Sequence, residues 1–356
     1  MTASKQPIGK PKKVVEKKMK PITALRLQRM IGLVVALFLL SVAIFLSLMI
    51  GAKPLSFGFV WEALFSSANS YDYTVVHESR IPRTIIALAV GPAFGLAGAV
   101  IQALTRNPLA DPGILGVNAG AAFAVALAVG VFSITSMSIY IWFALAGALT
   151  TTVAIYFIGG GAGKKSPSPE QITLAGVAMG AALGGITTSL SLMNSRAFAG
   201  MLNWRVGSLA RKGLEDLWPI IPFLLVGILI ALAIAPALNP IAYGDDRAAS
   251  LGVNLKMIRI LGLISVTLLA GGATAIAGPI VFLGLMVPHC VRWFIGPDQP
   301  WIFLYSLVIA PLILLLSDII GRVVISPAEV PVGIITGFVG APILIILMRR
   351  RKVSSL

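Results

Sequence analysis

The sequence contains little of what soluble enzymes use. Only 12% of its 356 residues are charged, against about 25% in soluble domains, which excludes a water-soluble fold. The single cysteine, Cys290, excludes an intrachain disulfide and argues against a structural zinc site. The two histidines, His77 and His289, are far apart, and the absence of a His-Glu-x-x-His helix excludes a metalloprotease. The sequence lacks the cluster of His, Asp and Glu residues that a membrane-embedded enzyme would need. We therefore expect neither catalytic residues nor a bound metal.

The sequence also lacks a complete nucleotide-binding loop. The Gly-rich stretch 159–166 resembles a phosphate loop, but Ile158 stands where glycine is required and Lys165 where Ser or Thr is required. The stretch follows an apolar run rather than a strand, so we interpret it as a flexible basic loop. We therefore expect no cofactor on this chain. If transport uses ATP, then ATP and magnesium bind a partner ATPase.

What the sequence has in abundance is apolar runs of about 20 residues, the length that spans a bilayer. Hydrophobic residues make up 57% of the chain, and the ten-residue alternation of a membrane β-barrel is absent. These features predict an all-α polytopic membrane protein with about ten transmembrane helices. The expected spans are Ile31–Ile50, Ile85–Leu104, Ile114–Phe132, Ile139–Ile158, Ile172–Met193, Leu217–Ala235, Ile258–Ala277, Ile280–Phe294, Trp301–Ile320 and Val332–Met348.

The net charge of +15 could indicate nucleic acid, but its placement favours a membrane protein. Basic residues cluster beside spans, where they set topology and meet anionic lipid. We expect a disordered basic cytosolic tail at 1–30, a transmembrane domain at 31–348 and a basic cytosolic C-terminus at 349–356. This topology for a cytoplasmic membrane leaves some basic residues on the outer side. They are Lys53, Arg80, Arg83, Arg196, Arg205, Arg211, Lys212 and Arg322.

The polar segment Tyr243–Gly252 separates two long apolar runs and carries three charges between two glycines. Ala248–Leu251 can form a short helix that Gly252 would end. A short helix on the cytosolic face suits the groove of a motor domain. An ordinary polar hairpin loop is the alternative.

Few charges lie in the apolar runs themselves. Asp318 is the one carboxylate in or near the interior of a span, and this scarcity argues against an ion-coupled secondary transporter. Asp318 and Arg322 are four residues apart and can pair on one helix face, with either a structural or a functional role. Arg80 and Arg83 either snorkel toward lipid phosphate or capture carboxylates of a soluble partner.

The expected fifth span combines small and polar residues. Gly176, Gly180 and Gly184 recur every four residues, which permits close helix approach. The alternatives are ordinary packing and a helix that lines a pore or faces a second copy. The polar outer half of this span favours a translocation path, for which the candidates are Gln102, Asn118, Thr187, Thr188 and Ser191.

Several short stretches, taken together and in this order, resemble the FecCD-type permease family. These are the membrane subunits of ABC importers for iron–siderophores, haem and cobalamin. The stretches are Arg80-Ile-Pro-Arg83, Gly98–Gln102, Arg106–Pro112, Leu115-Gly116, Leu174–Gly176, Trp204–Leu209, Ala249–Gly252, Gly278–Leu285, Pro288–Arg292, Asp318–Arg322 and Glu329–Gly333. They run from about Arg80 to Pro342.

The resemblance implies a type II ABC importer fold with two permeases, identical or different, two ATPases, and a substrate-binding protein or lipoprotein. It implies that Arg80, Arg83 and Arg322 pair with glutamates of the binding protein. It also implies that a coupling segment at about 240–256 sits on the ATPase. Its residues are Asp245, Asp246, Arg247, Ala249, Leu251 and Gly252.

The same resemblance favours one cargo over the others. The stretch Arg106–Pro112, with Gly207-Ser208, is more similar to siderophore members than to cobalamin members. We therefore expect a non-enzymatic permease for an iron(III)–siderophore, with cobalamin or haem as the alternative within the family. An ion-coupled secondary transporter is the alternative from another class.

Overall fold

The computed structural model describes residues 22–65, 71–134, 136–161, 168–193, 204–210 and 213–349. Most of the expected basic tail lies outside the described residues. So do Lys165 and most of its loop, and residues 350–356 of the basic C-terminus. Three of the basic residues expected on the outer side of the membrane are also not among the described residues: Arg196, Arg211 and Lys212.

Ten apolar helices confirm the predicted all-α membrane architecture. They are α1 (Ile22–Met49), α4 (Ile81–Thr105), α5 (Val117–Gly130), α6 (Met137–Tyr156), α7 (Pro169–Met193), α10 (Ile221–Ile241), α12 (Leu255–Ala277), α13 (Leu283–Ile295), α14 (Gln299–Val323) and α15 (Val332–Arg349). In the described part of the chain, seven helical stretches are long and apolar enough to cross a membrane. The helices α5, α13 and α15 contribute the three shorter apolar stretches.

Short helices connect the long ones. They are α2 (Phe57–Phe65), α3 (Tyr71–Thr74), the π-helical turn η1 (Val75–Arg80), the 3₁₀ turn η2 (Pro112–Leu115), η3 (Phe157–Gly161), α9 (Leu214–Leu217) and α11 (Asp245–Ser250). Several of them, η1, η3, α9 and α11, lie in polar or glycine-containing segments between the apolar runs.

The two predicted boundaries that differ most from the structure are wrong because helices extend beyond the most apolar residues. Helix α1 begins at Ile22, so residues 22–30 belong to the first helix and not to a disordered tail. The second span begins near Tyr71 rather than Ile85, as one helical stretch to Thr105. Pro82 lies in the first turn of α4, directly after the π turn, where a missing N–H costs little.

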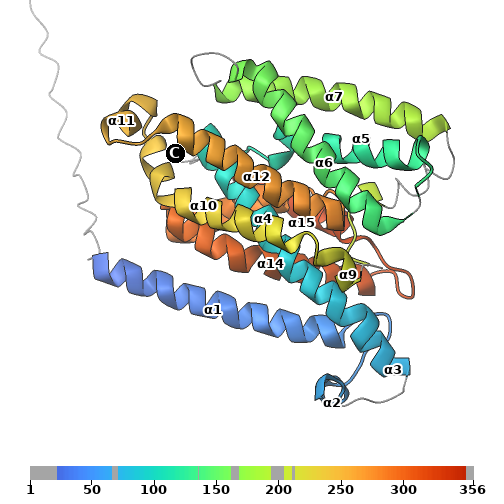
Figure 1. Cartoon of the computed structure of the whole chain (residues 1–356). Coiled ribbons are helices and arrows are strands. Elements are labelled where there is room, and N and C mark those ends of the chain that lie inside the picture. The colour runs from blue at the N-terminus through green and yellow to red at the C-terminus, as the bar shows by residue number, and fades with distance from the viewer. Residues whose placement is uncertain are drawn as a thin grey trace, which may run out of the picture.

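Helix α4 forms the centre of the bundle. It packs against α10, α12, α13 and α14, while α1 covers α14 on one side and α5, α6 and α7 form a group on the other (Figure 1). A Cβ on Gly98 would lie 1.7 Å from the carbonyl oxygen of Gly284, so only glycine permits this approach of α4 and α13. Close approach through small residues is a common way to pack membrane helices.

The bundle has two distinct ends (Figure 1). We call the end that carries α2 and α3 the α2 end. We call the end that carries α11, together with the beginning of α1, the α11 end. The long helices run between these two ends and place the candidate functional residues at one or the other.

Candidate functional site

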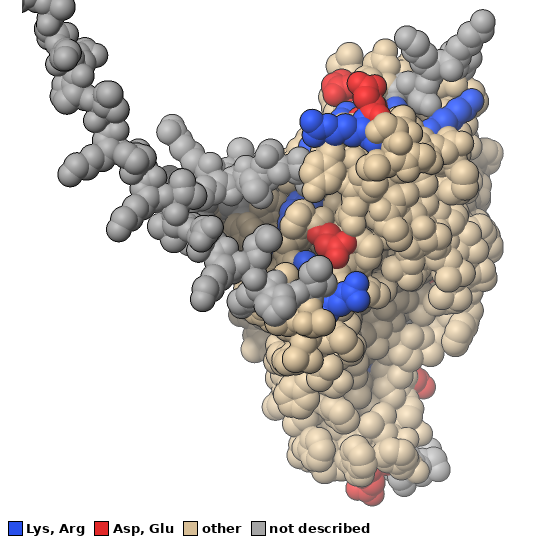
Figure 2. Space-filling model, turned by 90° about the vertical axis from the view of Figure 1, so that its left-hand side faces the viewer, with Lys and Arg blue, Asp and Glu red and all other residues tan. Residues whose placement is uncertain are grey.

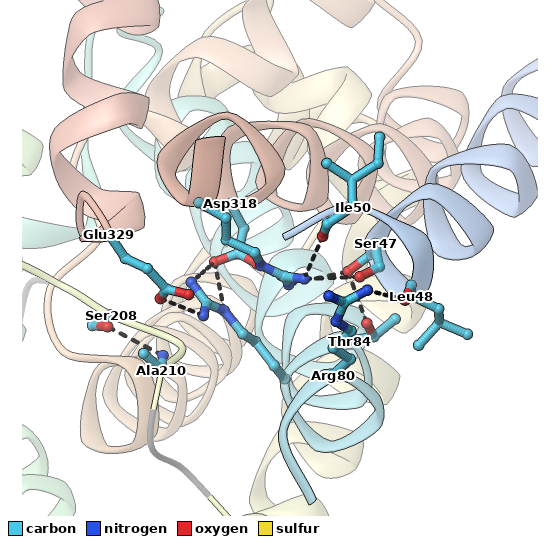
Figure 3. A network of polar contacts seen from close by, with 11 residues as sticks. Ser47, Leu48, Ile50, Arg80, Thr84, Ser208, Ala210, Asp318 and Glu329 are labelled. Carbon is cyan, nitrogen blue, oxygen red and sulfur yellow. Dashed lines mark hydrogen bonds and ion pairs between the residues drawn. The ribbon is translucent and has the colours of Figure 1, made fainter. Parts of the chain in front are cut away.

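Five charged residues, four of them buried, form a cluster at the α2 end, which we call the arginine network (Figure 3). Its members are Arg80, Arg83, Asp318, Arg322 and Glu329. Arg80 ends η1 and Arg83 lies in the first turn of α4, whereas Asp318 and Arg322 occupy successive turns of α14. Glu329 lies in the connection to α15. Helices from distant parts of the sequence therefore meet through their charges.

Asp318 is the shared anion of the network. Its Oδ1 accepts from the Nε of Arg83 at 2.8 Å and lies 2.6 Å from the Nη2 of the same residue. Its Oδ2 pairs with Arg322 on the next turn, which confirms the predicted pair. The carboxylate is only 1% exposed, so both cations compensate a charge that has almost no access to solvent.

The remaining donors of the network hold the end of α1. Arg80 Nη1 donates to the carbonyl oxygen of Leu48 at 2.6 Å, and Arg322 Nη1 donates to that of Ser47 at 2.8 Å. The Oγ of Ser47 lies 2.9 Å from the Oγ1 of Thr84. Because α1 ends at Met49, these donors satisfy carbonyl groups that the helix itself leaves free. The network thus joins α1, α4 and α14.

This geometry changes the interpretation of the three arginines. Arg80, Arg83 and Arg322 are buried and bonded within the chain, so the alternative in which Arg80 and Arg83 snorkel toward lipid is wrong. Glu329, whose side chain is 38% exposed, bonds the Nη1 of Arg83 at 2.7 Å and is the outermost member. The network has one more cation than anions. The docking role of the arginines stays a prediction.

A second charged group lies at the α11 end. The Oδ2 of Asp245 accepts from the Nη2 of Arg259 at 2.6 Å, and its Oδ1 lies 3.7 Å from the Nη2 of Arg106. The side chain of Asp245 is 36% exposed. These pairs connect the first residue of α11 to α12 and to the residue that ends α4. Such partly exposed pairs contribute little to stability.

The predicted coupling segment forms a helix, although not with the predicted bounds. Helix α11 spans Asp245–Ser250 instead of 248–251, and Gly252 follows it with φ +84°. The carboxylates at its N-terminus favour the earlier start. Only Ala248 is buried, whereas the other side chains are largely exposed. The exposed members include Asp246, Arg247, Ala249 and Leu251.

The face of the molecule at this end carries mixed charge. Figure 2 shows acidic and basic side chains gathered near the top of that face, with a second small group below them. Tyr243 and Leu251 add exposed apolar surface, at 69% and 71%. Charged and apolar groups side by side are typical of protein contacts. The coupling role stays a prediction.

The connection between α4 and α5 also lies at the α11 end, where Arg106 is close to Asp245. Arg106 ends α4 in the left-handed region, at φ 52°. The Oδ1 of Asp111 accepts from the backbone N–H of Gly113 at 2.8 Å and so begins η2. Burial raises the pKa of the Asp111 carboxyl, and the bond from Gly113 partly opposes this shift.

The five predicted path residues lie in separate contacts. Gln102 is fully buried between α4 and α13 and donates to the carbonyl oxygen of Leu285 at 3.1 Å. The Oδ1 of Asn118 accepts from the hydroxyl of Thr274 at 3.0 Å, between α5 and α12. On α7, two of the three hydroxyl residues are buried and the third is exposed. They are Thr187, Ser191 and Thr188, respectively.

The path role of these residues stays a prediction. The glycines of α7 differ from one another: a Cβ on Gly176 would lie 1.7 Å from the carbonyl oxygen of Ile114, whereas one on Gly180 or Gly184 would meet open space. Gly176 therefore serves packing within the chain. The other two leave part of α7 open to a neighbour.

Sequence reasoning missed the polar contacts at the α11 end, among them one at the beginning of α1. Arg29 pairs with the Oδ2 of Asp298 at 3.0 Å and donates to the carbonyl oxygen of Ile295 at 2.9 Å. The Nδ2 of Asn239 donates to the Oδ1 of Asp298 at 2.9 Å. This contact fixes the beginning of α1 against the connection between α13 and α14. The charges were visible in the sequence, but their separation of 269 positions gave no signal of contact.

Comparisons with known proteins agree with this architecture. A solved structure described as an inward-facing conformation of a metal-chelate type ABC transporter superposes with a TM-score of 0.78. It is 25% identical and covers 89% of this chain and 98% of its own. Residues 39–350 of the chain match the FecCD transport family.

Curated relatives match along almost the same length. The ferric enterobactin transport system permease protein FepD of Escherichia coli is 45% identical over 88% of this chain and 94% of its own. The probable siderophore transport system permease protein YfiZ of Bacillus subtilis is 35% identical over 90% and 96%. The iron(3+)-hydroxamate import system permease protein FhuB of B. subtilis is 36% identical over 90% and 84%.

The fold therefore defines a membrane permease of the type II ABC importer class. The ten apolar helices fit that class. Within it, the chain belongs to the FecCD transport family.

Proposed function

We propose that this chain is the permease subunit of an ABC importer that carries an iron(III)–siderophore across the cytoplasmic membrane of a prokaryote. The observation that carries the proposal is the 45% identity to a ferric enterobactin permease along 88% of the chain. Three relatives, named for transport of ferric enterobactin, a siderophore and iron(3+)-hydroxamate, support the same cargo class. Cobalamin and haem are the alternative cargoes.

Separate chains supply energy and cargo in this proposal. The sequence has no complete nucleotide-binding loop, so ATP and magnesium bind partner ATPases. The ATPase contacts the exposed α11 end, which faces the cytosol together with both termini. The binding protein or lipoprotein docks at the α2 end, where the arginine network has an excess of positive charge. A second permease, identical or similar, packs near the open glycines of α7.

The described contacts suggest how movement of α11 reaches the bundle. The Oδ1 of Asn254 accepts from the N–H of Met257 at 3.1 Å and begins α12 only a few residues after α11. Helix α12 packs on α4, α6 and α10. In the proposed cycle, ATP closes the ATPases, α11 moves with them, and α12 transmits the displacement. Release of the Gln102 contact between α4 and α13 accompanies opening.

The test is ATP-driven uptake with every partner identified. We would purify the chain in mild detergent with all co-purifying subunits, identify each by mass spectrometry, and reconstitute them in liposomes. The proposal predicts uptake of a ferric siderophore into the liposomes that requires ATP in the lumen, on the same side of the membrane as the ATPases. Uptake that an uncoupler abolishes and ATP depletion does not would instead establish an ion-coupled carrier. Preferential uptake of cobalamin or haem would change the cargo.

Reversed charge at the arginine network tests the docking role. Arg83→Glu places three carboxylates together, whereas Arg26→Glu reverses an exposed charge at the other end of the molecule. We expect weaker binding-protein affinity only for the first variant. Unchanged affinity in a folded Arg83→Glu transporter removes Arg83 from the docking surface.

A further inference from the structure

A surface groove of about 220 Å³ lies between α6 and α12. Its walls include Val153, Tyr156 and Phe157 from α6 and its C-terminal end. Ile260 and Ile264 belong to the opposite wall, on α12. The side chains of Val153, Phe157 and Ile264 are 54%, 56% and 43% exposed, so the groove opens sideways on the apolar surface of the bundle.

The two threonines of the groove offer little to a polar ligand. The hydroxyl of Thr152 donates to the carbonyl oxygen of Ala148 at 3.0 Å, and that of Thr267 donates to Leu263 at 2.7 Å. Both are thus bonded to their own helices. The groove is therefore an apolar seat that a molecule enters from the lipid rather than from water.

A lysine side chain, Lys256, lies at the α11 end of this apolar groove. Lys256, Ile260 and Ile264 are spaced by four residues, so they lie on one face of α12. Lys256 is exposed and has no acidic partner among the described residues. The nearby Arg259 differs, because Asp245 already neutralises it at 2.6 Å. The free charge is therefore one helical turn from the apolar seat.

We propose that this groove binds an anionic glycerophospholipid, with an acyl chain in the apolar seat and the phosphate on Lys256. An apolar chain joined to a negative headgroup matches the order of the two features along α12. A long basic side chain at the end of a membrane helix reaches the headgroup region, where one lysine strengthens attachment of an anionic lipid. A zwitterionic lipid would gain less from the lysine.

The position of the site gives it a further consequence. Lys256 lies in the first turn of α12, directly after α11. A lipid bound there contacts the helix that follows the proposed ATPase contact. Binding itself needs only this chain, so it can be measured independently of the proposed transport function.

The experiment uses the purified full chain in nanodiscs of equal parts phosphatidylglycerol and phosphatidylcholine. Trace amounts of either lipid carry a photoreactive group on the acyl chain, and mass spectrometry locates the cross-links. We expect phosphatidylglycerol to label residues 149–157 and 260–267 at least several-fold more than phosphatidylcholine does. Equal labelling by the two lipids, or labelling confined to other helices, overturns the proposal.

Two pairs of variants separate the headgroup contact from the apolar seat. Lys256→Gln should lower phosphatidylglycerol labelling about fivefold, whereas Lys256→Arg should keep it. Arg26→Gln, at an exposed cation of α1, is the matched control and should have no effect. A Lys256→Gln yield equal to that of the wild type contradicts the proposed headgroup contact.

Val153→Trp fills the seat and should lower labelling, whereas Val34→Trp on the exposed surface of α1 should not. Thermal unfolding of each variant establishes that it is folded. Both valines are more than half exposed, at 54% and 65%, so neither change disturbs a core. A folded Val153→Trp protein with full labelling overturns the assignment of the acyl chain to this groove, as does a cross-link there to a second copy of the chain.

Discussion

The two ends of the molecule use the same residue types in opposite ways. At the α2 end, Asp318 is 1% exposed and two arginines share it. At the α11 end, the side chain of Asp245 is 36% exposed, and its nearest atoms are 2.6 Å from Arg259 and 3.7 Å from Arg106. Each carboxylate meets two arginines, but only the first is withdrawn from solvent.

This difference indicates that the arginine network at the α2 end is fixed, whereas the charged contacts at the α11 end can rearrange. Removal of one partner from a buried pair leaves an uncompensated charge, so the arginine network must hold as a unit. The pairs at the α11 end are partly exposed and worth little, which allows this end to move or to take a new partner at little cost. The contrast agrees with our proposal that α11 moves together with a partner ATPase.

The largest effect is expected for Asp318→Asn. The change leaves Arg83 and Arg322 buried without their shared anion, which costs about 3–5 kcal/mol. Thermal unfolding in detergent measures it. The matched control is Asp72→Asn, whose pair with Lys53 is exposed by 28% and 60% on the two side chains and contributes under about 1 kcal/mol. Equal losses for the two variants would contradict the distinction between buried and exposed pairs.

A substitution of glycine tests the packing at the α2 end. A Cβ on Gly333 would lie 2.1 Å from the carbonyl oxygen of Val206, whereas one on Gly337, a turn later in α15, would meet nothing within 4 Å. We expect Gly333→Ala to destabilise by about 1–3 kcal/mol. Gly337→Ala should be neutral or stabilise by up to about 1 kcal/mol. The unfolding temperatures of the two variants check this prediction, and the reverse order would refute it.

Glu329→Gln should have a smaller effect than Asp318→Asn. Its side chain is 38% exposed, and Arg83 retains two contacts with Asp318 after the change. We expect a loss of about 1 kcal/mol or less. Denaturation at low and high salt measures it, because salt partly screens a pair in which one side chain, Glu329, reaches solvent. A loss of unfolding free energy as large as that of Asp318→Asn would show that Glu329 is as important to the arginine network as the buried Asp318.

The smallest effect on stability is expected for Asp245→Asn. The lost pairs are partly exposed, with side chains 16–36% exposed, so the unfolding free energy should fall by less than about 1 kcal/mol. ATP-driven uptake should fall much more, because Asp245 begins the helix that we propose contacts the ATPase. Asp246→Asn, which removes a charge without a pair among the described residues, is the control for stability. Unaltered uptake in Asp245→Asn would argue against coupling through this residue.

The sequence predicted those features that depend on local pattern. Apolar runs located the ten helices, and a spacing of four residues identified the pair of Asp318 and Arg322. It did not predict that η1 and α4 continue from Val75 without a break, because a π turn before Pro82 has no simple signature.

Contacts between distant residues were also beyond prediction. Arg83 and Glu329 are 246 positions apart, and nothing local to either shows that the tertiary fold joins them. The three arginines were expected at the outer surface because their positions interrupt the charge bias. The structure buries them because α1 and α14 supply carbonyl groups and a carboxylate at the same end.

The most direct test of the account is uptake of a radiolabelled ferric siderophore into liposomes that contain this permease and its ATPase. The binding protein is added outside, and ATP is supplied to the ATPase or withheld. The account predicts accumulation against a gradient only with ATP, and its loss when the ATPase is omitted. Accumulation by the purified permease alone, without nucleotide, would contradict it.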